Sequence, residues 1–127
     1  MRLLLDTHAV IWWFEGNERL PQRVRDVIDQ GGEVFVSAVS AYEIALKHRL
    51  GRLPDAATLA GNFEEMTAEQ QFKPLAITMA HALAAGKLAI GHRDPFDRLL
   101  IAQALVDNLA LATNERIFDA TGVSRVW

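Results

Sequence analysis

The feature that most constrains the fold is a short apolar run, Leu3-Leu4-Leu5, which ends directly at an acid, Asp6. Consecutive leucines leave no polar face, so the run is typical of a strand that is buried on both sides. Strands of this kind occur in parallel sheets whose two faces are covered by helices. The beginning of the chain therefore predicts a parallel sheet inside an α/β fold.

Further strand-like runs alternate with helical stretches along the chain. We expect strands at 3–5, 33–36, 72–77, 109–113 and 123–127, the last of them at an edge of the sheet. We expect helices at 7–15, 20–30, 40–50, 55–71, 78–85 and 95–108, and a short helix at 115–120. This alternation predicts an α/β fold with a mainly parallel sheet covered on both faces.

Composition excludes several kinds of site. The chain has no cysteines, which excludes disulfides, thiolate zinc sites and cysteine nucleophiles. The net charge is −3, whereas a domain that binds nucleic acid by bulk attraction is usually basic. Any binding of nucleic acid must therefore be local, or must use metal ions that screen the phosphates.

Length and hydropathy indicate an ordinary globular domain. The chain has 127 residues, 50% of them hydrophobic, and we expect one domain that spans residues 1–127. The apolar run at residues 3–5 is far too short for a signal-peptide core or a membrane span. We expect a cytoplasmic protein without membrane contact.

Four acids fall near the predicted carboxyl edge of the sheet. Asp6 and Glu115 follow apolar strands, while Glu43 and Asp97 lie one turn into helices that leave the same edge. Carboxylates packed together repel one another, and some must protonate unless a cation lies between them. Hard oxygen ligands suit Mg²⁺ or Mn²⁺, which can hold a phosphodiester and activate a bound water. The acids therefore predict a divalent-ion site that needs no protein nucleophile.

Each of these acids also has an ordinary structural explanation. Asp6 can cap the helix that follows it. Ser40 and Glu43 match the Ser-x-x-Glu capping box at a helix start. Glu115 can be a common first-turn acid that favours the helix dipole.

The stretch from His92 to Ala104 starts charged and continues as a mostly apolar helix. Asp94 is interpreted as the cap ahead of Pro95, which suits the first helical position. Asp97 lies one turn further on, where an acid favours the positive end of the helix and can also reach a metal ion. His92 is interpreted as a partner at the helix start, with proton transfer as the alternative.

Most of the chain resembles the PIN-domain family, and within it the VapC-type ribonuclease toxins of type II toxin–antitoxin pairs. The segments that carry the resemblance are 3–9 (LLLDTHA), 36–45 (VSAVSAYEIA) and 92–104 (HRDPFDRLLIAQA). The first and third segments together are specific. The resemblance implies that Asp6, Glu43 and Asp97 are catalytic metal ligands. Glu115 stands where the family usually has aspartate, so Asn114 or Asp94 could fill that fourth position instead.

This resemblance also implies a three-layer α/β/α fold and endoribonuclease activity that depends on Mg²⁺ or Mn²⁺. A VapB-type antitoxin would block the site and bind operator DNA within the complex, and the toxin would form homodimers. Ser37 and Thr113 match small hydroxyl residues that line the family's site.

Several cations could contact an RNA substrate. Arg93 and Arg98 lie beside the predicted acidic cluster and are candidates for contacts with RNA phosphates. Lys47, Arg49 and Arg52 follow Glu43. They are interpreted as a solvated helix end, where cations suit the helix dipole, with phosphate contact as the alternative.

Two other functions remain open at this point. An aspartate directly after a strand can be the nucleophile of an aspartyl-phosphate phosphatase, which would be Asp6 here. That chemistry typically has a second acid two positions later, where this chain has His8. Alternatively, every acid is a helix cap in a non-catalytic binding module.

Overall fold

A computed structural model describes residues 1–127, and its centre is a five-stranded sheet in which every neighbouring pair of strands is parallel. The strand order is β3-β2-β1-β4-β5. The middle strand β1 (Arg2–Leu5) pairs with β2 (Glu33–Ser37) and with β4 (Ala110–Ala112). The edges are β3 (Lys73–Leu75) and β5 (Arg125–Val126). The predicted parallel sheet is confirmed.

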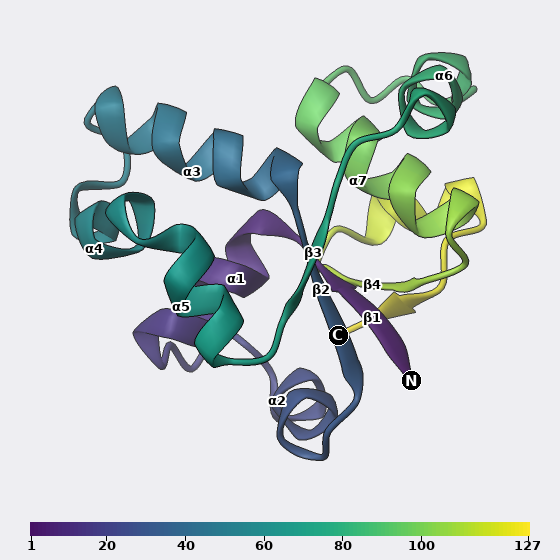
Figure 1. Ribbon diagram of the computed structural model, residues 1–127. Helices are drawn as coiled ribbons and strands as arrows, with labels where there is room; N and C mark the ends of the chain where they lie inside the picture. Colours follow the sequence, from purple (N-terminus) through teal and green to yellow (C-terminus); the bar gives the residue numbers. More distant parts are fainter.

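Helices cover both faces of the sheet, which confirms the three-layer α/β/α architecture. The α-helices are α1 (Thr7–Glu15), α2 (Gln22–Asp29), α3 (Ala38–Arg49), α4 (Ala57–Gly61), α5 (Phe63–Glu69), α6 (Met79–Lys87) and α7 (Pro95–Val106). The 3₁₀ helices are η1 (Pro54–Ala56) and η2 (Arg116–Thr121). Figure 1 shows α1, α4 and α5 on one side of the sheet and α6 and α7 on the other. None of these helices has the length and hydrophobicity needed to cross a bilayer.

The leucines of β1 divide between the two layers of core. Leu3 and Leu5 belong to one hydrophobic cluster, with residues from α1, α2 and α4, whereas Leu4 belongs to the other, with residues from α7 and η2. Side chains alternate between the faces of a strand, so three consecutive leucines serve both cores. All three are 0% exposed, and each contributes roughly 2 kcal/mol of burial free energy. This strand fixes Asp6 at the carboxyl edge.

The helix that follows β2 begins earlier than predicted, and this changes the interpretation of Glu43. Its N-cap is Ser37, whose Oγ accepts the backbone N–H of Val39 at 3.0 Å. Ser40 instead lies inside α3, where its hydroxyl is 3.0 Å from the hydroxyl of Thr7. The Ser40–Glu43 capping box is therefore wrong, and Glu43 lies too deep in the helix to act as a cap.

Other boundaries differ in smaller ways. The single helix predicted at 55–71 is three short segments, η1, α4 and α5, with a break at Asn62, whose φ is −137°. The Asn62 side chain donates to the carbonyl of Thr58 at 2.9 Å, an alternative hydrogen bond that favours a break in the helix. The short helix after β4 is 3₁₀ rather than α. The predicted start of α7 at Pro95 is confirmed.

Candidate active site

Three acids, one directly after a strand and two in helices, lie near one another beyond the carboxyl edge of the sheet. Asp6 ends β1, Glu43 lies on α3 and Asp97 lies in the first turn of α7. Figure 1 shows α1 and α3 leaving the same end of the sheet. The negative charge of Asp97 raises the pKa of Asp6, and that of Glu43 raises the pKa of Asp97. The predicted acids at these three positions therefore lie close enough to repel one another.

Asp6 is buried, and its burial changes its protonation. It is 7% exposed, and burial raises its pKa to about 6. Hydrogen bonds from the backbone N–H of Ala9, at 2.7 Å, and from the side chain of Thr113 act in the opposite direction. Asp6 therefore caps α1 and still presents a carboxyl group that is costly to ionise. Thr113 is buried beside it.

Glu43 is paired with a cation that sequence analysis placed at a solvated helix end. Its carboxylate is 2.5 Å from Nζ of Lys47, one turn later on α3. Glutamate and lysine at this spacing share one face of a helix, so the signal was present in the sequence. Glu43 itself is 6% exposed, and Lys47 compensates its charge in a setting largely shielded from solvent.

Asp97 is held by a histidine that precedes its helix. The Nε2 atom of His92 lies 2.7 Å from Oδ2 of Asp97, which confirms His92 as a partner at the helix start. Burial raises the pKa of Asp97, the His92 hydrogen bond lowers it, and the charge of Asp94 raises it again. Asp94 caps α7, because its Oδ1 accepts the N–H of Phe96 at 2.9 Å and that of Asp97 at 3.3 Å.

Arg98 binds the loop that carries His92. Its guanidinium donates to the carbonyls of Ala85 at 3.1 Å, Leu88 at 2.8 Å, Ile90 at 3.2 Å and His92 at 2.9 Å. Sequence analysis made Arg98 a candidate for an RNA contact, but these donors point at the protein's own backbone. Arg98 therefore fixes the His92 backbone, and the His92 side chain fixes Asp97.

We expect Arg98→Lys to lower the free energy of unfolding by about 1.5 kcal/mol. Lysine keeps the charge but loses the planar fork that reaches several carbonyls at once, which leaves buried acceptors without donors. Urea denaturation of the metal-free protein measures the change. Arg93→Lys is the matched control, since Arg93 is exposed, and should stay within about 0.5 kcal/mol of wild type. Equal denaturation midpoints for both variants would contradict the assignment.

A buried polar chain lies beside the acids and was missed in part by sequence analysis. The hydroxyl of Ser37 donates to Oε1 of Gln103 at 2.6 Å, and the Gln103 amide donates to the carbonyl of Ala76 at 3.3 Å. Gln103 is 0% exposed. Its only signal in the sequence is that it is the one polar residue between Leu99 and Leu105. These hydrogen bonds link β2 to α7, and therefore link the elements that position Glu43 and Asp97.

The remaining candidates lie at the surface. Asn114, Glu115 and Arg93 are exposed. The backbone N–H of Glu115 donates to the hydroxyl of Thr113 at 3.2 Å, and Thr113 is the residue whose side chain bonds to Asp6. The structure thus groups Asp6, Glu43 and Asp97 and leaves the fourth acidic position open.

The three carboxylates are the kind of ligand that a hard divalent cation prefers. Their positions, however, do not form a coordination shell. Asp6, Glu43 and Asp97 supply only oxygen ligands, which Mg²⁺ and Mn²⁺ prefer, and their mutual repulsion would be relieved by a cation. However, no group of three or more histidine or acidic side chains in residues 1–127 is placed to hold an ion. One oxygen of Glu43 already contacts Lys47, and one oxygen of Asp97 already contacts His92. An ion would have to take over from these two partners.

Known proteins share both the sequence pattern and the fold. A family model described as PIN domain matches residues 3–123. Ribonuclease VapC22 of Mycobacterium tuberculosis is 28% identical over 115 residues, which are 90% of this chain and 87% of that protein. The FitAcB structure from Neisseria gonorrhoeae has a TM-score of 0.72 at 20% identity and covers 98% of this chain and 96% of that one. VapBC2 of Rickettsia felis, solved with a promoter DNA fragment, has a TM-score of 0.69 at 13% identity, with coverage of 100% and 99%.

Proposed function

Because this chain belongs to the PIN-domain family, we propose that it is a VapC-type toxin that cleaves RNA phosphodiester bonds with the help of Mg²⁺ or Mn²⁺. The observation that carries the proposal is the electrostatic contact between Asp6, Asp97 and Glu43. Burial raises the pKa of Asp6 and of Asp97, and a neighbouring acid raises each of them further, which is costly in a purely structural role. Similarity to Ribonuclease VapC22 supports RNA as the substrate.

In this proposal the three carboxylates hold the divalent ion. When bound, the ion lowers the pKa of a water molecule and stabilises the negative charge that develops on the leaving oxygen. Asp6 is held by Thr113 and by the start of α1, which keeps its carboxyl group at the carboxyl edge of the sheet. His92 orients Asp97. Arg93, exposed at the start of this segment, is the cation that we assign to substrate phosphate.

Partners of the toxin belong to the same proposal. We assign a VapB-type antitoxin, which would cover the acids and bind operator DNA as part of the complex. The fold shared with VapBC2 from Rickettsia felis, a complex solved on promoter DNA, supports both assignments. A homodimer of the toxin is proposed on family grounds alone. Mixing the purified toxin with the antitoxin should suppress RNA cleavage at a stoichiometric ratio.

The direct test is digestion of total RNA by the purified protein, with the cut ends mapped by sequencing. We expect discrete cleavage in Mn²⁺ or Mg²⁺ and no cleavage in EDTA, because the ion supplies several kcal/mol of charge stabilisation. Cleavage that persists in EDTA would contradict the metal-dependent mechanism. No cleavage of any RNA under any metal, with a phosphorylated Asp6 trapped instead, would favour the phosphatase alternative.

A further inference from the structure

A pocket opens between α1, α3 and the loop that follows α3. It has a volume of about 300 Å³ and is lined by Thr7, His8 and Ile11 of α1, Lys47 of α3, and Arg52 and Leu53 of the loop that follows α3. We call it the α1–α3 pocket. Two of its six lining residues are cations and a third is histidine, whereas the whole chain has a net charge of −3.

The pocket and the acidic site share their wall. Thr7 is the residue after Asp6, and Lys47 lines the pocket while its ammonium group pairs with Glu43. The charge of His8 acts on Asp6, whose pKa it lowers. An anion in the pocket would therefore lie directly beside a substrate held at the three carboxylates.

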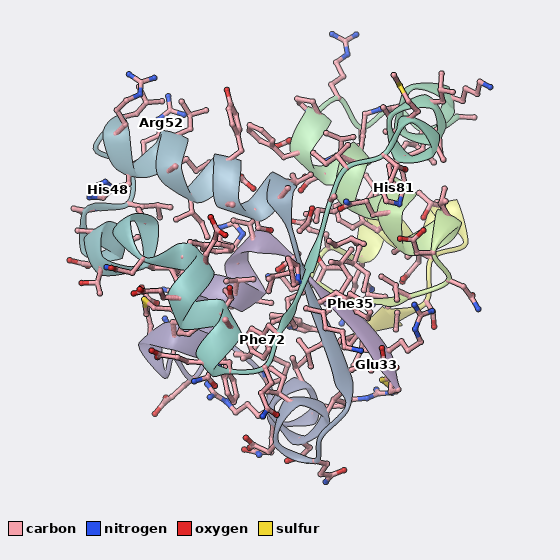
Figure 2. All side chains as sticks on the ribbon, viewed as in Figure 1. Glu33, Phe35, His48, Arg52, Phe72 and His81 are labelled. Carbon is pink, nitrogen blue, oxygen red and sulfur yellow. The ribbon has the colours of Figure 1, made fainter.

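Besides Lys47, which pairs with Glu43, the pocket has two basic side chains that a ligand can reach. Arg52 is exposed, and its backbone N–H, not its guanidinium, bonds to the carbonyl of Lys47. Figure 2 shows Arg52 at the far end of α3, on the outer surface of the molecule. His8 is exposed as well, and its imidazole keeps at least one N–H donor in either protonation state. A guanidinium and an N–H donor facing one cavity suit the oxygens of a phosphate.

We propose that the α1–α3 pocket binds a backbone phosphate of single-stranded RNA adjacent to the phosphate that is cleaved. The inference rests on the proposed function and extends it to a second contact with the same strand. It also distinguishes the basic residues after Glu43 that line the pocket from one that does not. Lys47 and Arg52 line the pocket, whereas Arg49, which lies between them in sequence, does not. Arg49 is exposed elsewhere on α3.

This division supplies a matched pair of variants, Arg52→Gln and Arg49→Gln, which remove the same charge from the same region. Binding of a short fluorescein-labelled RNA to the full chain in EDTA, followed by anisotropy over a range of salt concentrations, compares them without cleavage. One lost phosphate contact should weaken binding roughly fivefold near 0.1 M salt and reduce the slope of log K against log salt by about 0.7. We expect this change for Arg52→Gln only.

Other outcomes are equally informative. If wild type cleaves RNA in Mn²⁺ but Arg52→Gln and Arg49→Gln bind it alike, the pocket assignment is wrong and the proposed function stands. If wild type neither binds nor cleaves RNA, both are wrong. A labelled oligoglutamate peptide tests the remaining source of anions. Should Arg52→Gln weaken binding of the peptide and leave RNA binding unchanged, the pocket belongs to an acidic protein segment and the inference is overturned.

Discussion

Replacing Asp97 by asparagine should reduce metal-dependent RNA cleavage by at least about 10³-fold. Asparagine removes the negative charge that we propose as a ligand of the ion, and a bound ion would supply several kcal/mol of transition-state stabilisation, where each 1.4 kcal/mol is about tenfold in rate. The variant keeps an oxygen that can accept a hydrogen bond from His92 at the present 2.7 Å. It also leaves the cap of α7 in place, because Asp94 provides that cap. Initial rates on a defined RNA in Mn²⁺ measure the effect.

A matched control is Asp29→Asn, the same chemical change at the opposite end of the sheet. Asp29 is exposed and is the last residue of α2, just before β2 begins. This variant should cleave RNA at the wild-type rate. Asp97→Asn activity within about tenfold of that control would exclude Asp97 as a catalytic ligand. Asp97 would then be explained by its place in the first turn of α7, and cleavage would have to depend on other residues.

Asp6→Asn should raise the free energy of unfolding of the metal-free protein at neutral pH. It should also reduce RNA cleavage, as Asp97→Asn does. The folded protein raises the pKa of Asp6 from 3.8 to about 6, so the folded state binds this proton more tightly than the unfolded state does. The contribution of protonated Asp6 to the free energy of unfolding is therefore complete below about pH 4 and is lost as the pH rises through 6. Above that range the ionised carboxylate costs about 3 kcal/mol in the metal-free protein.

Asparagine removes this cost while it remains a good N-cap for α1. The free energy of unfolding of Asp6→Asn relative to wild type should rise by about 3 kcal/mol between about pH 4 and pH 8. Urea denaturation in EDTA at both pH values measures the difference, with Asp29→Asn as the same substitution at an exposed site. An advantage that is the same at both pH values would show that charge burial is not its cause. Saturating Mn²⁺ should stabilise wild type more than the variant, because the ion compensates the charge.

Local sequence pattern was sufficient for the parallel sheet and for the three grouped acids. Leu3-Leu4-Leu5 could only be a doubly buried strand, and the topology of a parallel sheet then brought Asp6 to the same edge as Asp97. Pattern could not choose between Ser37 and Ser40 as the cap of α3. Both are serines at the same helix start, and the choice depends on Thr7, which takes the Ser40 hydroxyl from another element.

Contacts made by backbone atoms were beyond sequence reasoning. Arg98 was a candidate for an RNA contact because it is a cation beside an acidic cluster. Its actual partners are four carbonyls of the chain between Ala85 and His92, and a carbonyl has no side-chain signature in a sequence. For the same reason the fourth acidic position stays undetermined. Whether Glu115 points inward depends on the turn after β4, which the residue types alone do not specify.

The place of β1 in the middle of the sheet has a consequence for the order of folding. β1 precedes the other strands of the sheet in the chain, yet it pairs Leu3 with Ala110 of β4, so this contact closes a loop that contains most of the other helices and strands. Closing such a loop is entropically costly and slow compared with local pairing. Asp6 also needs Asp97 from α7, which is made shortly before β4. The acids therefore cannot come together until α7 has been made, so the acidic centre forms later than β1, β2 and the helices between them.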